Sequence, residues 1–292
     1  MMCIIILKRR VKVINFKLSN IAQLEMQVHV QLLCVLGLVG YASSLRMMMS
    51  LGEVHKSLFG KVDTQLKLKL TPYASERNVW TEGAFSGTCE WYEEKMGGKL
   101  TGVSKNTLKG PNFESVTLNC WMGPAYSVPH MLLKLTQAGS DVSLSADYVV
   151  RGSTPIGTDQ TVIDNFYGKE VNDWYDKAAS NGVLLPPPSS FSGRLLQSPI
   201  ALNVGKLSLE TATATASEHV ERWLQWIADK EGKGKQVEAR SRGAFNGRDD
   251  KLRQYAYRAV VSEMTLLLGS AGASIGAAAN GPIAEAYVGG GS

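Results

Sequence analysis

Met131–Tyr148 reads MLLKLTQAGSDVSLSADY, and this stretch decides which fold the sequence predicts. Its second half alternates apolar with polar side chains, which is the period of a strand that buries one face. Met131–Leu135 is a further strand candidate, and Gly139-Ser140-Asp141 is a turn between the two. Two strands joined by so short a turn run antiparallel. The apolar members of the alternation are Val142, Leu144, Ala146 and Tyr148, and the polar members are Ser143, Ser145 and Asp147.

The same two-residue period appears upstream, in Phe85–Tyr92 and in Val116–Cys120. Glycine-containing turns at Gly97-Gly98 and Gly110-Pro111 separate these strand candidates. Strands that follow one another through short turns predict an antiparallel meander rather than strand–helix–strand units.

Helical spacing follows downstream. Apolar residues in Ile163–Ala178 recur with a period of about 3.6 residues, which predicts one amphipathic helix. Ser217 is the predicted N-cap of a second helix, and a last long helix is predicted from Asp249 or Asp250 to about Gly269. A short helix is also predicted after Pro282. Together these elements predict the α+β class, with a central antiparallel sheet flanked by helices.

The formal charge of +5 belongs to the first fifty residues. Six of the 31 Lys and Arg residues and one of the 26 Asp and Glu residues lie there, which leaves 25 of each in residues 51–292. A neutral body argues against a nucleic-acid-binding domain, which usually carries a basic face. The apolar run Leu32–Ala42 is too short to span a bilayer but has the length of a signal-peptide core. We therefore predict a cleaved targeting leader at 1–50, with an ordinary N-terminal helix as the alternative, and a single domain at 51–292.

Several sequence motifs of common enzyme classes are incomplete or absent in this sequence. Gly272–Gly276 matches the GxSxG pattern of a nucleophile elbow, but no His follows it to take the proton. The sequence contains no Walker-A loop and no strand-borne GxGxxG. Cys89 and Cys120 form no CxxC pair, and His residues are sparse, so we predict two buried thiols and no metal site.

Three titratable residues are candidates for proton transfer. Glu263 falls in the apolar sector of the last predicted helix, where burial would raise the pKa of its carboxyl; alternatively, its tip reaches solvent or an Arg such as Arg222. Asp147 lies on the polar side of its strand, and its alternative role is a hydrogen bond to its own turn. His130 opens an apolar strand after Val128-Pro129, and the alternative there is a structural hydrogen-bond partner.

The order of several short segments resembles the red chlorophyll catabolite reductases and, more distantly, the ferredoxin-dependent bilin reductases. The resemblance covers residues 79–285 in consistent order. It implies an α/β/α sandwich that reduces an open-chain tetrapyrrole with electrons from reduced ferredoxin, binds no metal or flavin, and works in plastids. The segments that carry it are Val128–Leu135, Asp147–Arg151, Phe166-Tyr167, Trp174-Tyr175, Ser189–Pro199 and Arg248–Asp250.

The resemblance also assigns expected roles to individual residues. Arg194 and Arg151 match family positions, and Arg194 is expected to hold a propionate of the substrate. The alternative role of Arg151 is a salt bridge to Asp147 or Asp159. Lys134 stands where these reductases carry an acidic residue, so either a desolvated lysine donates the proton or the activity has been lost. The residues expected to form the pocket include Trp91, Trp121 and Trp174.

These observations predict a plastid, ferredoxin-dependent oxidoreductase that acts on a CH–CH group of a red chlorophyll catabolite-like tetrapyrrole in chlorophyll breakdown. The predicted catalytic residues are His130, Glu263 and Asp147, and the predicted substrate-binding residues are Arg194, Arg151 and Lys134. No bound cofactor, no nucleic acid and no membrane span in the mature protein are predicted. The alternatives are a bilin reductase, a non-catalytic bilin carrier on the same scaffold, and an unrelated α+β domain.

Overall fold

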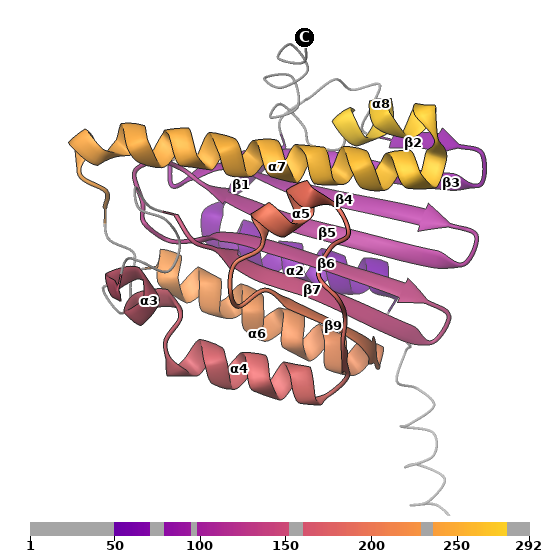
Figure 1. Cartoon of the computed structure of the whole chain (residues 1–292), viewed down its shortest axis with the longest axis horizontal. Coiled ribbons are helices and arrows are strands. Elements are labelled where there is room, and N and C mark those ends of the chain that lie inside the picture. Colours follow the sequence, from indigo (N-terminus) through magenta and orange to yellow (C-terminus); the bar gives the residue numbers. More distant parts are fainter. Residues whose placement is uncertain (1–49, 71–78, 95–97, 152–159, 229–235, 279–292) are drawn as a thin grey trace, which may run out of the picture. The chain divides into compact units, whose positions relative to one another are not determined.

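The computed structural model describes residues 50–70, 79–94, 98–151, 160–228 and 236–278 (Figure 1). The predicted leader at 1–50 lies outside these residues except for Ser50, and so does the helix predicted after Pro282. None of the helices in the described ranges is both long and apolar enough to cross a membrane.

A nine-stranded sheet forms the centre of the described structure, and every pair of neighbouring strands is antiparallel. The strand order is β1-β3-β4-β5-β6-β7-β9-β8, with β2 paired to β3. The predicted meander is confirmed, because β3 to β7 are neighbours in chain order. The strands are β1 Leu68–Leu70, β2 Val79–Glu82, β3 Phe85–Glu94, β4 Leu100–Gly110, β5 Phe113–Met122, β6 His130–Ala138, β7 Asp141–Val149, β8 Val183–Leu184 and β9 Leu202–Leu207.

Helices cover both faces of this sheet, which confirms the predicted α+β class. α2, α4 and α6 pack on one face, while α5 and α7 lie on the other (Figure 1). The helices are α2 Leu51–Leu66, α3 Gln160–Phe166, α4 Lys169–Ser180, α5 Phe191–Leu196, α6 Leu209–Ile227, α7 Arg242–Leu268 and α8 Ser270–Ala278, with a 3-10 turn at Ala239–Ser241.

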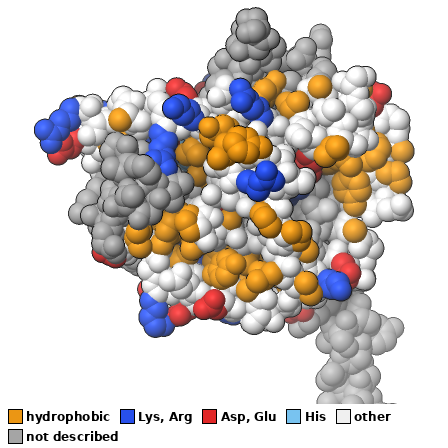
Figure 2. Space-filling model, viewed as in Figure 1, with side chains coloured by type: hydrophobic (Ala, Val, Ile, Leu, Met, Phe, Trp, Pro, Cys, Tyr) orange, Lys and Arg blue, Asp and Glu red, His pale blue; other side chains and the backbone are white. Residues whose placement is uncertain are grey.

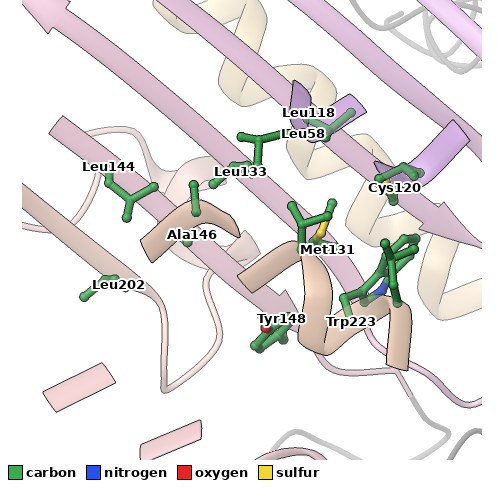
Figure 3. Packing of buried hydrophobic residues seen from close by; sticks show 14 of the residues in the cluster. Leu58, Leu118, Cys120, Met131, Leu133, Leu144, Ala146, Tyr148, Leu202 and Trp223 are labelled. Atoms are coloured by element: carbon green, nitrogen blue, oxygen red, sulfur yellow. The ribbon is translucent and has the colours of Figure 1, made fainter. Parts of the chain in front are cut away.

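In β5, β6 and β7 the apolar members of the strand alternation point toward α2 and α6 and form the main core (Figure 3). Leu144 and Tyr148 of β7 are fully buried there, as is Trp223 of α6, whose indole N–H donates to the Pro129 carbonyl over 2.9 Å. Packing of this kind removes apolar area from water and dominates the stability of a domain. The core also holds Leu58, Leu118, Cys120, Met131, Leu133, Ala146 and Leu202.

Two of the predicted helix boundaries are wrong. The stripe predicted as one helix over Ile163–Ala178 belongs to two helices, α3 and α4, because the helix breaks before Gly168, which is the N-cap of α4. Ser217 is not an N-cap but lies inside α6, where its hydroxyl accepts a hydrogen bond from Lys61. The actual N-cap is Ser208, whose Oγ accepts from the Thr211 N–H over 3.1 Å.

α7 begins earlier than predicted, at Arg242, but ends where predicted, before Gly269. Gly269 has a φ of +64°, a backbone conformation that favours glycine and ends the helix. The early start matters for the site. It gives α7 27 residues, so that one helix carries both the buried Asp249 and, further along, Glu263.

Candidate functional site

A pocket of about 400 Å³ lies between the sheet and the pair α5 and α7. Hydrophobic side chains gather on this face of the molecule, over α5 and α7 (Figure 2). The strands supply the floor of the pocket and the helices its walls. The floor includes Cys89, Asn106, Leu108, Ser115, Thr117, Asn119, Leu132, Lys134, Ser145, Asp147 and Asn203, and the helical walls include Gly193, Leu196, Ala256, Ala259, Val260, Glu263, Met264 and Leu266.

Polar members of the strand alternation form the middle of the pocket floor. Thr117, Lys134 and Ser145 are direct partners on three neighbouring strands, and Ser145 pairs in turn with Asn203. Directly paired residues of antiparallel strands project from the same face, so these side chains form one polar row across the floor. The Ser145 hydroxyl donates to the Asn203 side-chain oxygen over 2.7 Å. The row gives a ligand a hydrogen-bonding floor beneath apolar walls.

Two buried tryptophans lie beside the pocket, behind the residues that line it. Trp91 and Trp121 are buried against Ala256 of α7, with Leu132 of β6 packed beside them. A Cβ atom on Gly102 would lie 2.1 Å from Cζ2 of Trp91, so a glycine is required where that indole crosses β4. Both rings were predicted to form the pocket, but they pack at the α7 side of the sheet without lining it. The third predicted ring, that of Trp174, lies on the opposite face, where its N–H donates to the Thr215 carbonyl over 3.4 Å.

Asp147 is the buried acid of the pocket. Its carboxylate accepts a hydrogen bond from the Ser198 N–H over 2.9 Å and another from the Ser198 hydroxyl. Burial raises the pKa of Asp147 to about 6, although the two hydrogen bonds from Ser198 oppose that rise. A carboxyl group with this pKa is present in both protonation states near neutral pH, so it is able to release and recover a proton.

Lys134 and Glu263 form an ion pair that links the sheet to α7 inside the pocket. Lys134 projects from the polar row of the floor, and Glu263 projects from the helix opposite. The lysine side chain is 33% exposed and the glutamate side chain is 45% exposed. The tip of Glu263 therefore reaches both solvent and a cation, but the cation is Lys134 and not the Arg222 considered from sequence.

His130, Asp249 and Arg151 form a fully buried cluster at one end of α7. The Met122 N–H donates to His130 Nδ1 over 2.9 Å, so the ring proton is on Nε2, which donates to Asp249 Oδ1 over 3.1 Å. Arg151 Nε donates to both carboxylate oxygens over 3.1 Å. Arg151 also donates to the Tyr126 carbonyl.

Burial and the charge of Arg151 determine the protonation states of His130 and Asp249. Burial lowers the pKa of His130 to about 4, against the attraction of Asp249, so the imidazole is neutral at pH 7. Burial alone would raise the pKa of Asp249, but hydrogen bonds and charge interactions with His130 and Arg151 hold it below its ordinary value. A neutral His130 makes Arg151 the cation that keeps Asp249 ionised. The cluster therefore fastens α7 to the ends of β6 and β7.

The predicted site residues fall into three groups. Asp147, Lys134 and Glu263 line the pocket together. His130 and Arg151 lie beyond its lining, in the cluster with Asp249. Arg194 lies on α5, and its guanidinium donates to the Ser189 carbonyl over 2.6 Å and to the Pro188 carbonyl over 3.3 Å. The salt bridge considered for Arg151 exists, but its partner is Asp249.

Two polar residues of the site were not predicted individually. Ser198 forms a hydrogen bond with Asp147, which lies 51 residues earlier in the chain. Asp249 forms a hydrogen bond with His130, which lies 119 residues earlier. Both belong to segments that carry the family resemblance, and this is the signal in the sequence that marks them. Their partners could not be read from periodicity, which relates only neighbours in the chain.

In the described ranges no group of three or more His, Cys, Asp or Glu side chains is placed to hold a metal ion. Cys89 and Cys120 are buried thiols that form no disulfide, as predicted. They lie on opposite faces of the sheet, Cys89 in the pocket floor and Cys120 in the core. Burial raises the pKa of Cys89 to about 12, so its thiol is protonated at neutral pH.

No protein-family model matches this sequence, and no curated protein matches it in sequence. Its structure is similar to the crystal structure of phytochromobilin synthase from tomato in complex with biliverdin, with a TM-score of 0.58. The alignment covers 78% of this chain and 81% of the tomato chain, with 11% identical residues. At this identity the similarity shows a common fold. The chain therefore has the fold of phytochromobilin synthase.

Proposed function

We propose that this protein is a reductase of an open-chain tetrapyrrole that takes its electrons from reduced ferredoxin. The observation that carries the proposal is Asp147, a buried carboxyl group with a pKa of about 6 at the surface of a pocket on this fold. Reduction of a carbon–carbon double bond adds two electrons and two protons. Ferredoxin supplies the electrons singly, and the protein has to supply protons at the pocket.

The shape and polarity of the pocket support a linear tetrapyrrole as ligand. Such a molecule combines apolar rings with polar ring nitrogens and acidic side chains. Leu132, Leu196 and Ala256 offer apolar surface where the pocket borders the two tryptophans. The polar row through Lys134 offers hydrogen-bonding groups along the floor. Asp147 is placed beside this row as the proton donor, while Ser198 keeps its carboxyl group oriented.

The red chlorophyll catabolite is the substrate that we propose within this class. Its support is the resemblance in segment order, from Val128–Leu135 to Arg248–Asp250. Biliverdin is the competing substrate, and its support is the fold of the tomato protein, which was solved with biliverdin. We further propose a plastid location, for which the support is the basic and apolar pattern of residues 1–50.

An anaerobic assay tests the enzymatic proposal. The purified protein is incubated with ferredoxin, a ferredoxin-reducing system, and either the red catabolite or biliverdin, and product formation is followed by absorbance. We expect turnover of at least one pigment, and Asp147→Asn should lower the rate by about a hundredfold or more. Asp173→Asn, which removes an exposed carboxylate of α4, is the matched control and should keep the wild-type rate.

A bilin carrier is the second candidate, and the ion pair between Lys134 and Glu263 favours it. A lysine stands where the resemblance places an acidic residue, and the glutamate in the pocket is tied to that lysine. A carrier would bind biliverdin with a spectral shift but would leave it unreduced with either pigment. If Lys134→Glu then created reduction where the wild type showed none, the carrier interpretation would replace the enzymatic one.

A further inference from the structure

The pocket lining contains both a positively charged side chain and the carboxylate that neutralises it. Lys134 is the one Lys, Arg or His among the pocket-lining residues of the described segments. Glu263 neutralises it from α7, across the pocket from the floor. Asp147, the other acid of the lining, is held by both donors of Ser198. The Lys134 ammonium group is therefore the point in the pocket where an anionic group of a ligand finds a cation.

The exposure of the pair shows that it is able to open. The side chains of Lys134 and Glu263 are 33% and 45% exposed, whereas those of Arg151 and Asp249 are 0% and 1% exposed. A partly exposed ion pair contributes little to stability, because water replaces each partner when the pair separates. A buried pair leaves an uncompensated charge when one partner leaves. Of these two ion pairs, the one inside the pocket is exchanged at small cost.

The surroundings of Lys134 suit a carboxylate. Thr117 and Ser145 flank it as direct cross-strand partners, so residues with hydroxyl groups lie on either side of Lys134 in the same row. A carboxylate accepts several hydrogen bonds, and those from charged donors are the strongest. Glu263 already places a carboxylate on Lys134, so its own geometry marks the position that a ligand carboxylate would take.

We propose that Glu263 is a placeholder that a carboxylate of the ligand replaces on Lys134 when the pocket fills. The inference rests on the proposed function, since open-chain tetrapyrroles carry propionate side chains. It assigns Lys134 as the anchor of one propionate and Glu263 as a selectivity residue. A ligand that carries a carboxylate displaces Glu263 and recovers the ion pair, whereas an uncharged ligand leaves the pair in place.

Equilibrium binding without any electron donor tests this exchange. Biliverdin and its uncharged dimethyl ester are titrated into the full protein, and binding is followed by the change in pigment absorbance. We expect wild type to prefer the acid, and Lys134→Met to lower the affinity for the acid by about tenfold while changing that for the ester by less than about twofold. Glu263→Gln should raise the affinity for the acid by about two- to fivefold, because the competing carboxylate is gone.

The double variant and a matched pair of controls complete the test. In the background of Lys134→Met, Glu263→Gln should have no effect on biliverdin binding, because no cation remains to be released. Lys169→Met and Asp173→Asn break the exposed pair of α4, whose Nζ–Oδ2 distance is 2.5 Å, and should change neither affinity. Urea unfolding of each variant shows that the fold is retained.

The outcomes separate this inference from the proposed function. Equal loss of acid and ester binding in Lys134→Met, or weaker acid binding in Glu263→Gln, overturns the exchange even if the protein reduces bilins. Preference for the acid with the expected responses of both variants supports the exchange even if no pigment is reduced. Failure of both pigments to bind wild-type protein overturns the exchange together with the proposed function.

Discussion

The two faces of the central sheet differ sharply, although the same strands build both. Toward α2 and α6, β7 presents Leu144 and Tyr148 to a closed apolar core, and both side chains are fully buried. Toward α5 and α7, the same strand presents Ser145 and Asp147 to a pocket of about 400 Å³. The alternation along one strand therefore separates a face that stabilises the protein from a face that is available for chemistry.

The difference shows how the pocket stays open. Core side chains interlock at close to crystal density, so a cavity there would lose contacts and cost free energy. On the opposite face, α7 is held over the sheet by the buried cluster of Arg151, Asp249 and His130 at one end and by the packing of α5 against it. The ion pair and hydrogen bonds of Asp249 attach α7 to the sheet without side chains that fill the space between them.

Breaking the buried cluster is expected to have the largest effect on stability. Asp249→Asn leaves the Arg151 guanidinium buried without a counterion, which should lower the free energy of unfolding by about 3–5 kcal/mol. Urea unfolding followed by tryptophan fluorescence measures the loss. Asp173→Asn, which breaks an exposed pair of α4, is the control and should cost less than about 1 kcal/mol. Equal urea midpoints for Asp249→Asn and wild type would show that the cluster does not fasten α7.

Two adjacent positions of β7 compare the faces directly. Leu144→Ala opens a cavity in the core and should lower the free energy of unfolding by about 2–5 kcal/mol. Ser145→Ala removes one hydrogen bond, to Asn203, in a partly exposed row and should cost less than about 1.5 kcal/mol. Both variants are compared by urea unfolding at one pH. Similar costs for the two would contradict the division of the sheet into a stabilising face and an open one.

Asp147 should make the protein less stable as the pH rises. Because its pKa of about 6 in the folded state lies above the ordinary value, the folded state holds the proton more tightly than the unfolded state. The stabilising contribution is complete near pH 4 and is lost as the pH rises through 6. Asp147→Asn should therefore gain stability relative to wild type between pH 4 and pH 8, by on the order of 2–3 kcal/mol.

The control for this prediction is Asp141→Asn, which changes an exposed carboxylate at the start of the same strand and outside the pocket lining. Its stability relative to wild type should stay nearly constant across the same pH range. If Asp147→Asn behaved in the same way, the buried carboxyl group would not have the raised pKa on which the proposed proton transfer depends.

Filling the pocket should have the smallest effect on stability and a clear effect on binding. Ala259 lines the pocket from α7, so Ala259→Trp occupies ligand space without disturbing the core. We expect a change of less than about 1 kcal/mol in the free energy of unfolding and a drop of about tenfold or more in biliverdin affinity. Ala244→Trp, at an exposed position of the same helix, should leave binding unchanged. Unchanged binding in Ala259→Trp would place the ligand elsewhere.

Much of the fold could be predicted because it depends on neighbours in the chain. The two-residue period in Val142–Tyr148 assigned these side chains of β7 to a face, and Gly269 marked the end of α7. The predicted start of a helix was wrong where the local sequence pattern suggests a different structure from the one that the chain adopts. In α6, Leu209–Ala216 alternates like a strand, but the chain is helical there, and the Thr213 and Thr215 hydroxyls bond to carbonyls one turn earlier over 2.7 and 2.9 Å.

The candidate site could be predicted only in part. Polarity at a strand position identified Asp147, the family resemblance singled out Lys134, and helical spacing identified Glu263. The same reasoning gave no partner for any of them. Arg151 and Asp249 meet across 98 positions of the chain, and Lys134 and Glu263 across 129.

The sequence by itself determined the class of the fold, the two faces of the sheet and the residues able to carry a proton or a charge. Periodicity suffices for this, because the geometry of a strand or helix ties each side chain to a direction. Only the tertiary structure decided which charges are fixed and which are exchangeable. Arg151 and Lys134 are both cations beside a carboxylate, but one pair is sealed from water and the other opens onto a pocket. That distinction depends on burial, which segments far apart in the chain create together.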